Sequence, residues 1–475
     1  MLKIYNTLSR KVEEFTPFGS AQDKPTKDVG FYACGPTVYN YAHIGNLRAY
    51  IAQDILRRTL KYDGYKVKHV MNITDVGHLT DDADEGEDKM EKGAEREGKT
   101  ALQIADYYTD AFMENLCDLN ILEPNIWCKA TEHIPEQIKQ VQDLIDGGFT
   151  YETTDGIYFD TTKINDYGKL AGLDKQELEA GKRVNIGMKK NPHDFALWKW
   201  SKQSERHPER AEQVEGSTPI PKRQMEWEAF GHVGFPGWHI ECSAMAMKYL
   251  GDQFDLHAGG IDHIPVHHTN EIAQAESVTG LKPWVKYWFH NEFLIMSNEK
   301  MSKSSDNFIT LQTLKDKNID PLSYRYFLLQ SHYRKQTSFS WEALEAAQLG
   351  LKNLKKQIQK IAPDAPTDPI IEKNFFEALN NDLNTPEALA LLWNAVKENQ
   401  LNLDSIIKFD KILGLNLHEP EKKVVITDDV QKLLNEREKA RKNKDWVSSD
   451  TLRDDLLKLG FEVEDTPDGQ KIQNI

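Results

Sequence analysis

The arrangement of hydrophobic and polar residues in the first part of the chain changes from that of a strand to that of a helix and back again. Residues 29–34 form a short apolar run, which predicts a buried strand. Residues 44–60 carry apolar side chains at helical spacing, and residues 65–73 alternate between apolar and polar side chains before a second apolar run. A strand, a helix and a strand within so short a span indicate a right-handed parallel unit.

The parallel pattern stops after this unit and resumes near residue 237. Residues 80–99 are dominated by Asp, Glu, Gly and Lys, which predicts an exposed loop, and residues 101–119 follow the pattern of an amphipathic helix. In residues 127–230 short strand candidates alternate with polar loops, which we interpret as an insertion. Beyond it we expect helices at 238–250 and 267–277 and strands at 253–257 and 287–296.

The last third of the chain has a helical pattern almost throughout. We expect helices at 341–361, 370–379, 385–399, 427–442 and 446–459. Two prolines in residues 364–369 predict a break between helices, and residues 461–472 predict a small hairpin around Pro467, Asp468 and Gly469. The predicted fold class is therefore α/β, with a split nucleotide-binding domain, a helical bundle and a small C-terminal α/β module.

The composition indicates an ordinary globular protein. The 475 residues, 39% hydrophobic and 28% charged, correspond to about three domains. The net charge of −16 disfavours non-specific binding of nucleic acid but is compatible with a local basic face. Four widely spaced cysteines argue against a disulfide framework. Because no apolar run approaches ~18 residues and the N-terminus has no apolar signal core, we expect a cytoplasmic protein without a membrane partner.

Two short motifs suggest phosphate chemistry. His43, Ile44, Gly45 and Asn46 follow a predicted strand and open a predicted helix, and a helix N-terminus binds phosphate through its free N–H groups. Lys300, Met301, Ser302, Lys303 and Ser304 follow a later strand, and two ammonium groups can stabilise a triphosphate that expels pyrophosphate. Either motif alone is also compatible with a bland turn. Together, in this order, they resemble the signatures of class I aminoacyl-tRNA synthetases, with Asn46 where the first signature usually ends in His.

Four scattered residues have the chemistry of a zinc site. Cys34 ends a predicted strand, Cys242 lies on a predicted helix, and His267 and Glu271 share one face of another helix. Two thiolates, an imidazole and a carboxylate form a plausible Zn²⁺ set. Each residue also has an ordinary structural reading, and the nearby His257, His263 and His268 compete with His267 for the role of ligand.

The series of motifs resembles the cysteinyl-tRNA synthetase family over nearly the whole chain. The matching segments are residues 34–39, 43–46, 72–75, 237–243, 267–274 and 300–304. The resemblance implies one Zn²⁺ on Cys34, Cys242, His267 and Glu271, and a cysteine pocket shaped by Thr74 and Trp238. It also implies an adenosine site at Gly259, Gly260 and Asp262. Two departures from the family pattern lie near the adenosine wall. They are Ala258, where the family usually has Gly, and residues 263–266, where the family is more apolar.

The C-terminal segment carries a basic run beside an aromatic residue. The run consists of Arg437, Lys439, Arg441, Lys442 and Lys444, and Trp446 follows it. A run of this kind is commonly a solvated helix face, but basic and aromatic side chains also suit single-stranded bases. The resemblance implies an anticodon-binding module, in which Arg441, Trp446, Asp450 and Asp465 match tRNA-binding positions.

The resemblance also implies a domain order and a reaction. A Rossmann-like catalytic domain at 1–126 and 231–299 would be split by a connective insertion at 127–230. The stem-contact region at 300–340, the bundle at 341–426 and the anticodon module at 427–475 would follow. The carboxylate of L-cysteine would attack ATP, with its Mg²⁺, and the cysteinyl group would then pass to tRNA(Cys). His43, Asn46, Lys300 and Lys303 would stabilise phosphate charge, Gly45 and Lys303 would also contact ATP, and the protein would act as a monomer.

Two alternative functions can be distinguished from this interpretation by features of the sequence. A ligase that passes cysteine to an amino-sugar would lack the long C-terminal region. A non-catalytic RNA-binding relative would be expected to lose its phosphate motifs, both of which are present here.

Overall fold

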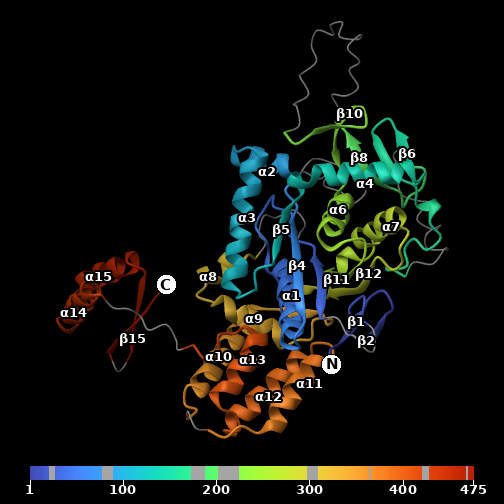
Figure 1. Ribbon diagram of the computed structural model, residues 1–475. Coiled ribbons are helices and arrows are strands. Elements are labelled where there is room, and N and C mark those ends of the chain that lie inside the picture. Colours follow the sequence, from blue (N-terminus) through green and yellow to red (C-terminus); the bar gives the residue numbers. More distant parts are fainter. Residues whose placement is uncertain are drawn as a thin grey trace, which may run out of the picture.

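A five-stranded parallel sheet lies at the centre of the molecule (Figure 1). The computed structural model describes residues 1–20, 27–76, 89–172, 188–201, 224–296, 309–362, 365–419, 427–466 and 469–474. The sheet has the order β12-β11-β3-β4-β5. Its strands are β3 (Asp28–Ala33), β4 (Lys66–Ile73), β5 (Ile126–Lys129), β11 (Phe254–Gly260) and β12 (Val285–Asn291).

Helices cover both faces of this sheet. Alternate residues of β3 point to opposite sides, so Phe31 and Ala33 join the core under α1 (Ile44–Tyr62) and α3 (Ala101–Asp118). Tyr32, and Cys34 just beyond the strand, join the second core under α6 (Trp238–Leu250) and α7 (His267–Thr279). The alternation therefore places Cys34 on the side of the sheet that carries Cys242 and His267.

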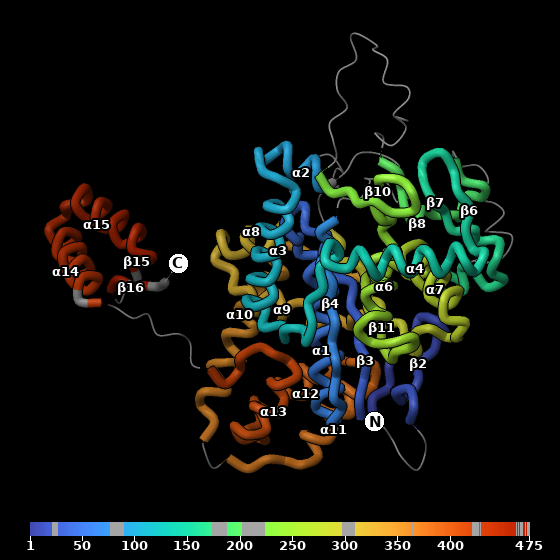
Figure 2. Tube along the Cα trace, turned by 45° about the horizontal axis from the view of Figure 1, so that its top comes forward, coloured from blue at the N-terminus to red at the C-terminus, as the bar shows by residue number. Residues whose placement is uncertain are grey.

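A second sheet has the antiparallel order β6-β7-β8-β10-β9, and its strand β10 lies beyond residue 230, where the insertion was expected to end. Helix α4 packs against α6 and α7 and against this sheet (Figure 2). The elements are α4 (Ile134–Asp146), β6 (Thr150–Thr153), β7 (Gly156–Phe159), β8 (Phe195–Trp200), β9 (Trp227–Ala229) and β10 (His232–Pro236). An N-terminal hairpin, β1 (Lys3–Asn6) and β2 (Lys11–Glu14), packs beside β12.

The C-terminal part is helical, as the sequence predicts. The bundle, drawn in orange in Figure 1, contains α10 (Trp341–Ile358), α11 (Pro369–Asn380), α12 (Thr385–Lys397) and α13 (Leu403–Leu413). The last module, α14 (Asp428–Lys442), α15 (Trp446–Lys458), β15 (Phe461–Thr466) and β16 (Gly469–Asn474), has a small core of its own. No helix among the described residues is long and apolar enough to cross a membrane.

Several predicted elements differ from the structure. Residues 80–99 are not a loop throughout, because α2 (Lys89–Glu97) buries Met90 and Ala94 against the main core. Two apolar residues in a charged stretch gave too weak a pattern to predict this helix. The expected strand at 287–296 is two strands, because the chain leaves the sheet after Asn291 and β13 (Leu294–Met296) pairs with β14 (Thr337–Phe339) instead. The sequence analysis also omitted α8 (Leu311–Asp316), α9 (Pro321–Leu329) and α13.

A buried ion cluster joins the catalytic domain to the helical bundle. Asp54 of α1 accepts hydrogen bonds from Arg58, at 2.7 Å, and from Arg325 of α9, at 2.6 Å. The guanidinium of Arg325 also donates to the carbonyl oxygens of Leu119 and Leu413, which lie at the ends of α3 and α13. The pair of Asp54 and Arg325 thus ties together four helices from three parts of the chain.

We expect Asp54→Asn to lower the free energy of unfolding by about 3 kcal/mol, because it leaves the buried guanidinium of Arg325 without its carboxylate. Urea denaturation measures this change. The control is Asp106→Asn, since Asp106 pairs with Lys129 at the surface, and its change should stay below about 1 kcal/mol. Equal losses in the two variants would contradict the assignment.

The pH dependence of stability gives a second readout of Asp54. Burial alone would raise the pKa of this carboxyl, but Arg325 and Arg58 outweigh it and lower the pKa below its usual value. The stabilisation is therefore fully present above the unfolded pKa of about 4 and is lost as the pH falls through the lower folded value. The Asp54→Asn variant should lose less stability than the wild type over this acidic range.

Candidate active site and metal centre

A cavity of about 490 Å³ opens at the carboxyl ends of the central strands. In parallel α/β sheets this edge is where ligands bind. Most of the residues singled out in the sequence meet here although they come from six separate segments. The lining includes Cys34, His43, Gly45, Asn46, Thr74, Trp238, Cys242, Gly259, Gly260, Asp262 and His267.

The first phosphate motif forms the N-terminus of α1. His43 is the N-cap, its Nδ1 accepts the Asn46 N–H at 3.2 Å, and the Asn46 Oδ1 accepts the His43 N–H at 3.3 Å. This reciprocal cap explains how Asn serves at a position where His is usual, because its amide oxygen completes the cap and its NH₂ group remains a donor. Burial lowers the pKa of His43, with Asp262 opposing, and an accepting Nδ1 leaves the proton on Nε2.

The four predicted metal ligands lie together. One donor atom from each of Cys34, Cys242, His267 and Glu271 can be chosen so that all lie within 4.8 Å of one another, and all four residues are buried. His267 Nε2 is 3.1 Å from Glu271 Oε1, as expected for residues four apart on α7. Because two of the donors are sulfur, the set suits zinc better than a hard cation such as Mg²⁺.

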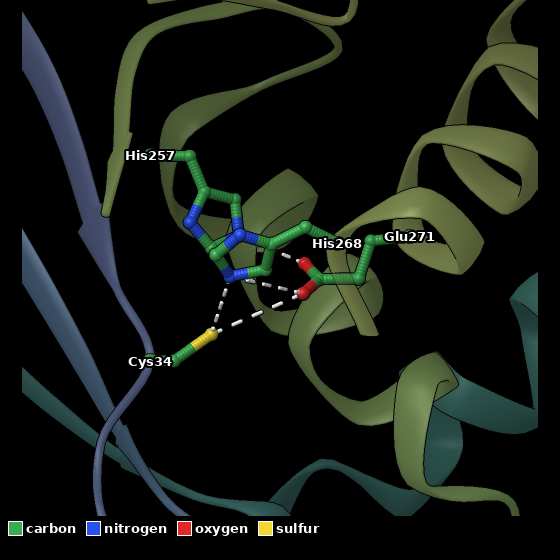
Figure 3. A group of neighbouring side chains, drawn as sticks. All are labelled: Cys34, His257, His268 and Glu271. Carbon is green, nitrogen blue, oxygen red and sulfur yellow. Dashed lines mark hydrogen bonds and ion pairs between the residues drawn. The ribbon is translucent and has the colours of Figure 1, made fainter. Parts of the chain in front are cut away.

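A second set of possible ligands overlaps the first. Figure 3 shows Cys34, His257, His268 and Glu271, which satisfy the same distance criterion. His257 Nε2 lies 2.9 Å from Glu271 Oε2, and Cys34 Sγ lies 3.3 Å from His268 Nε2. The two sets share Cys34 and Glu271, so the two sets cannot each hold a fully coordinated ion of their own. Two of the histidines that competed in the sequence analysis therefore touch the first set directly.

The charges in the cluster depend on one another. Burial alone would raise the pKa of Glu271, but His257 and His267 lower it to about 2. Burial alone would lower the pKa of His267, but Glu271 and Cys242 raise it to about 10. The hydrogen bond with Cys34 lowers the pKa of Cys242 to about 7. A protonated His267 must lose its proton to ligate a metal, so metal affinity should rise with pH.

The residues expected to hold cysteine and adenosine border the metal cluster. The Trp238 ring lies 4.5 Å from the His267 ring, and the buried Thr74 hydroxyl accepts a hydrogen bond from Asn72 at 3.0 Å. A Cβ atom on Gly259 would lie 2.6 Å from His263 Nδ1, so only glycine fits at this point of the wall. Ala258, one of the departures from the family pattern, belongs to the core under α1 and is not among the residues that line the cavity.

The structure places the predicted tRNA-binding residues in the C-terminal module. Trp446 is 55% exposed, and the Arg441 guanidinium lies 5.6 Å from its ring centroid. Asp465 accepts two hydrogen bonds from Arg437 at 2.9 Å and pairs with Arg441 at 2.7 Å, whereas Asp450 is exposed. Arg437 is only 1% exposed and is thus a buried brace, not part of a basic solvated face. Lys300 and Lys303 lie outside the described residues.

The sequence analysis missed residues that support the site. His239, next to Trp238, lies 2.9 Å from His267 through their Nδ1 atoms, and His290 of β12 lies 2.7 Å from His268. Arg48 of α1 is also buried near the cavity. The unusual number of histidines between residues 239 and 290 was a usable signal, but the sequence does not show which of them face one another.

Comparison with known proteins agrees with this arrangement. Residues 21–349 match the family model described as tRNA synthetases class I (C) catalytic domain. Residues 374–417 match a DALR domain, and residues 425–472 match the cysteinyl-tRNA ligase anticodon binding domain. The chain is 48% identical to cysteine–tRNA ligase 1 of Burkholderia lata, over 99% of this chain and 96% of that protein. The chain belongs to the cysteine–tRNA ligase family.

Other relatives and a solved structure extend the likeness. The cysteine–tRNA ligase of Treponema denticola is 44% identical over 98% of both chains. Among solved structures, Mycobacterium tuberculosis methionyl-tRNA synthetase in complex with methionyl-adenylate aligns with a TM-score of 0.57. The alignment covers 89% of this chain and 96% of that one at 16% identity, and it shows a shared class I synthetase fold.

The two overlapping ligand sets make different predictions for metal content. If the first set holds the ion, Cys242→Ser should lose most of about one zinc per chain, as measured by elemental analysis of the purified protein. His257→Gln should retain zinc with an affinity reduced by about 10–100-fold, because His257 only orients Glu271. Cys117→Ser changes an exposed cysteine and is the control. Zinc retained in Cys242→Ser and lost in His257→Gln would assign the ion to the second set.

Proposed function

We propose that this protein activates L-cysteine with ATP to form cysteinyl-adenylate and transfers the cysteinyl group to tRNA(Cys). One observation supports the proposal: a buried cluster with two sulfur donors and the N-terminus of α1, with His43 and Asn46, lie at the same cavity. Cysteine has a thiol at one end and a carboxylate at the other. A site with a soft cation at one end and anion-binding donors at the other suits that substrate.

At the phosphate end, the residues act on charge and need no covalent intermediate with the protein. The carboxylate of cysteine attacks the α-phosphorus of ATP, the α–β bridging bond breaks, and pyrophosphate leaves with its Mg²⁺. His43 donates from Nε2 and Asn46 from Nδ2 to phosphate oxygens as negative charge develops. Lys300 and Lys303 neutralise the departing pyrophosphate, Gly45 lets the backbone approach ATP, and Gly259, Gly260 and Asp262 contact the adenosine.

At the other end, Cys34, Cys242, His267 and Glu271 would hold one Zn²⁺. When bound, zinc supplies a soft Lewis acid that favours the thiolate of cysteine over the hydroxyl of serine. The Trp238 ring lies beside the His267 ring and Thr74 closes the neighbouring wall, so these two residues limit the size of the side chain that reaches the ligands. The donor set fits this role because all four ligands are buried and two are sulfur.

The terminal ribose hydroxyl of tRNA(Cys) then takes the cysteinyl group from the adenylate, and AMP leaves. The C-terminal module would bind the anticodon through Arg441, Trp446 and Asp450, with Asp465 holding Arg441 against the indole. The match of residues 425–472 to an anticodon-binding model favours tRNA over an amino-sugar acceptor. We expect the protein to act as a monomer in the cytoplasm.

The wild-type protein should catalyse cysteine-dependent exchange between ATP and pyrophosphate. Cysteine and serine differ by one atom, and pocket shape alone typically separates such close analogues by only about 10–200-fold. The preference for cysteine over serine should therefore exceed that range. Cys242→Ser should raise the KM for cysteine far more than the KM for ATP. A cysteine preference within the range of shape alone, or equal effects on both KM values, would remove the metal from substrate recognition.

Replacing Arg441 by Gln should raise the KM for tRNA about tenfold, because the guanidinium lies over the exposed indole of Trp446. ATP–pyrophosphate exchange should stay unchanged, because Arg441 is far along the chain from the residues of the cavity. Lys442→Gln removes a neighbouring positive charge that pairs with Glu438 of the same helix and is the matched control. If the two variants weaken tRNA charging equally, Arg441 contributes only general charge.

A further inference from the structure

Arg48 is a buried cation whose acceptors are all main-chain carbonyls in the described part of the chain. It lies on α1 five residues after His43 and is 4% exposed. Its guanidinium donates to the carbonyl oxygens of Phe293, Tyr333 and Lys335. Burying a guanidinium is costly unless its donors are well paired. A buried, planar guanidinium that donates to two chain segments therefore fixes the positions of both segments relative to α1.

The carbonyls that Arg48 holds belong to a crossing of two segments. Phe293 lies in the turn between β12 and β13, and Tyr333 and Lys335 precede β14. The two segments are joined by hydrogen bonds from the Glu292 N–H to the Tyr333 carbonyl, at 2.9 Å, and from the Thr337 N–H to the Phe293 carbonyl, at 3.2 Å. One side chain of α1 therefore fixes the point where the chain leaves the central sheet.

This crossing is part of the cavity and leads to the second phosphate motif. Residues 291–294 line the same cavity as His43 and Asn46. The chain then continues through β13 to residues 297–308, which include Lys300 and Lys303, and the described structure resumes at Ile309. The Ile309 carbonyl accepts the Ile44 N–H at 2.9 Å, and the Tyr324 hydroxyl donates to the Ile44 carbonyl at 2.7 Å. Residues on both sides of 297–308 are thus bonded to the first two turns of α1.

We propose that Arg48 is a positioning residue for the ATP-dependent step, because it holds the cavity wall at residues 291–294 in register with the helix that carries His43 and Asn46. The inference rests on the proposed function. It assigns no contact with substrate to Arg48. A misplacement of about 1 Å in such a wall can lower the rate about a hundredfold without removing any reacting group.

The test compares Arg48→Lys with Arg57→Lys. Arg57 lies on the same helix, is 5% exposed and donates to the carbonyls of Leu122 and Glu123, which are not part of the cavity lining. Both variants keep the charge and lose the fork, so urea denaturation should show similar losses of stability. Only Arg48→Lys should lower the kcat of cysteine-dependent ATP–pyrophosphate exchange, by about tenfold or more, with the KM for cysteine and the zinc content unchanged.

Arg48→Gln, which keeps two donors without the charge, should show the same separation between kcat and the KM for cysteine. Equal kcat losses in Arg48→Lys and Arg57→Lys would overturn the proposal, as would a raised KM for cysteine at constant kcat. Absence of cysteine-dependent exchange in the wild type would instead refute the proposed function. An active wild type with an undiminished kcat in both Arg48 variants would refute the positioning role alone.

Discussion

The catalytic half of the structure is organised around one buried carboxylate, that of Glu271, which lies among side chains that can share a proton or a metal. Its oxygens lie 2.9 Å from His257 Nε2 and 3.1 Å from His267 Nε2. A buried carboxylate is costly unless it is paired, so these neighbours are required for the fold as well as for the chemistry. They come from β11 and α7, while Cys34 follows β3 and Cys242 lies on α6. The parallel sheet, with α6 and α7 on one face, brings them together.

The same sheet explains why the cavity has two chemical ends. Cys34 follows β3 and faces α6 and α7, whereas the next segment of chain leads to the N-terminus of α1 on the other face. The crossover therefore places hydrogen-bond donors for an anion in the same cavity as the cluster of soft ligands. Arg48 connects a further part of the cavity wall to α1, because it donates to the Phe293 carbonyl where the chain leaves β12. The fold therefore brings the two groups of side chains to one cavity, and the side chains determine the chemistry available at each end.

Much of the fold could be predicted because its signals are local. Helices α6 and α15 start at the residues where the sequence changes to helical spacing, and the hairpin forms around its predicted turn. The joining of Cys34, Cys242, His267 and Glu271 was predicted from donor chemistry and a family resemblance. Helix α2 was not predicted because two buried residues, Met90 and Ala94, are a weak signal in a charged stretch. The brace role of Arg437 and the contacts of His257 depend on tertiary packing, which residue spacing does not reveal.

The proposed function requires that the cluster act on the substrate sulfur and not serve a structural role alone. X-ray absorption at the zinc edge, with and without L-cysteine, tests it most directly. We expect one additional sulfur neighbour of zinc when cysteine is added to the purified protein, and no change when serine is added. An unchanged sulfur count while cysteine is bound would contradict it, and discrimination would then have to come from the shape of the pocket around Thr74 and Trp238.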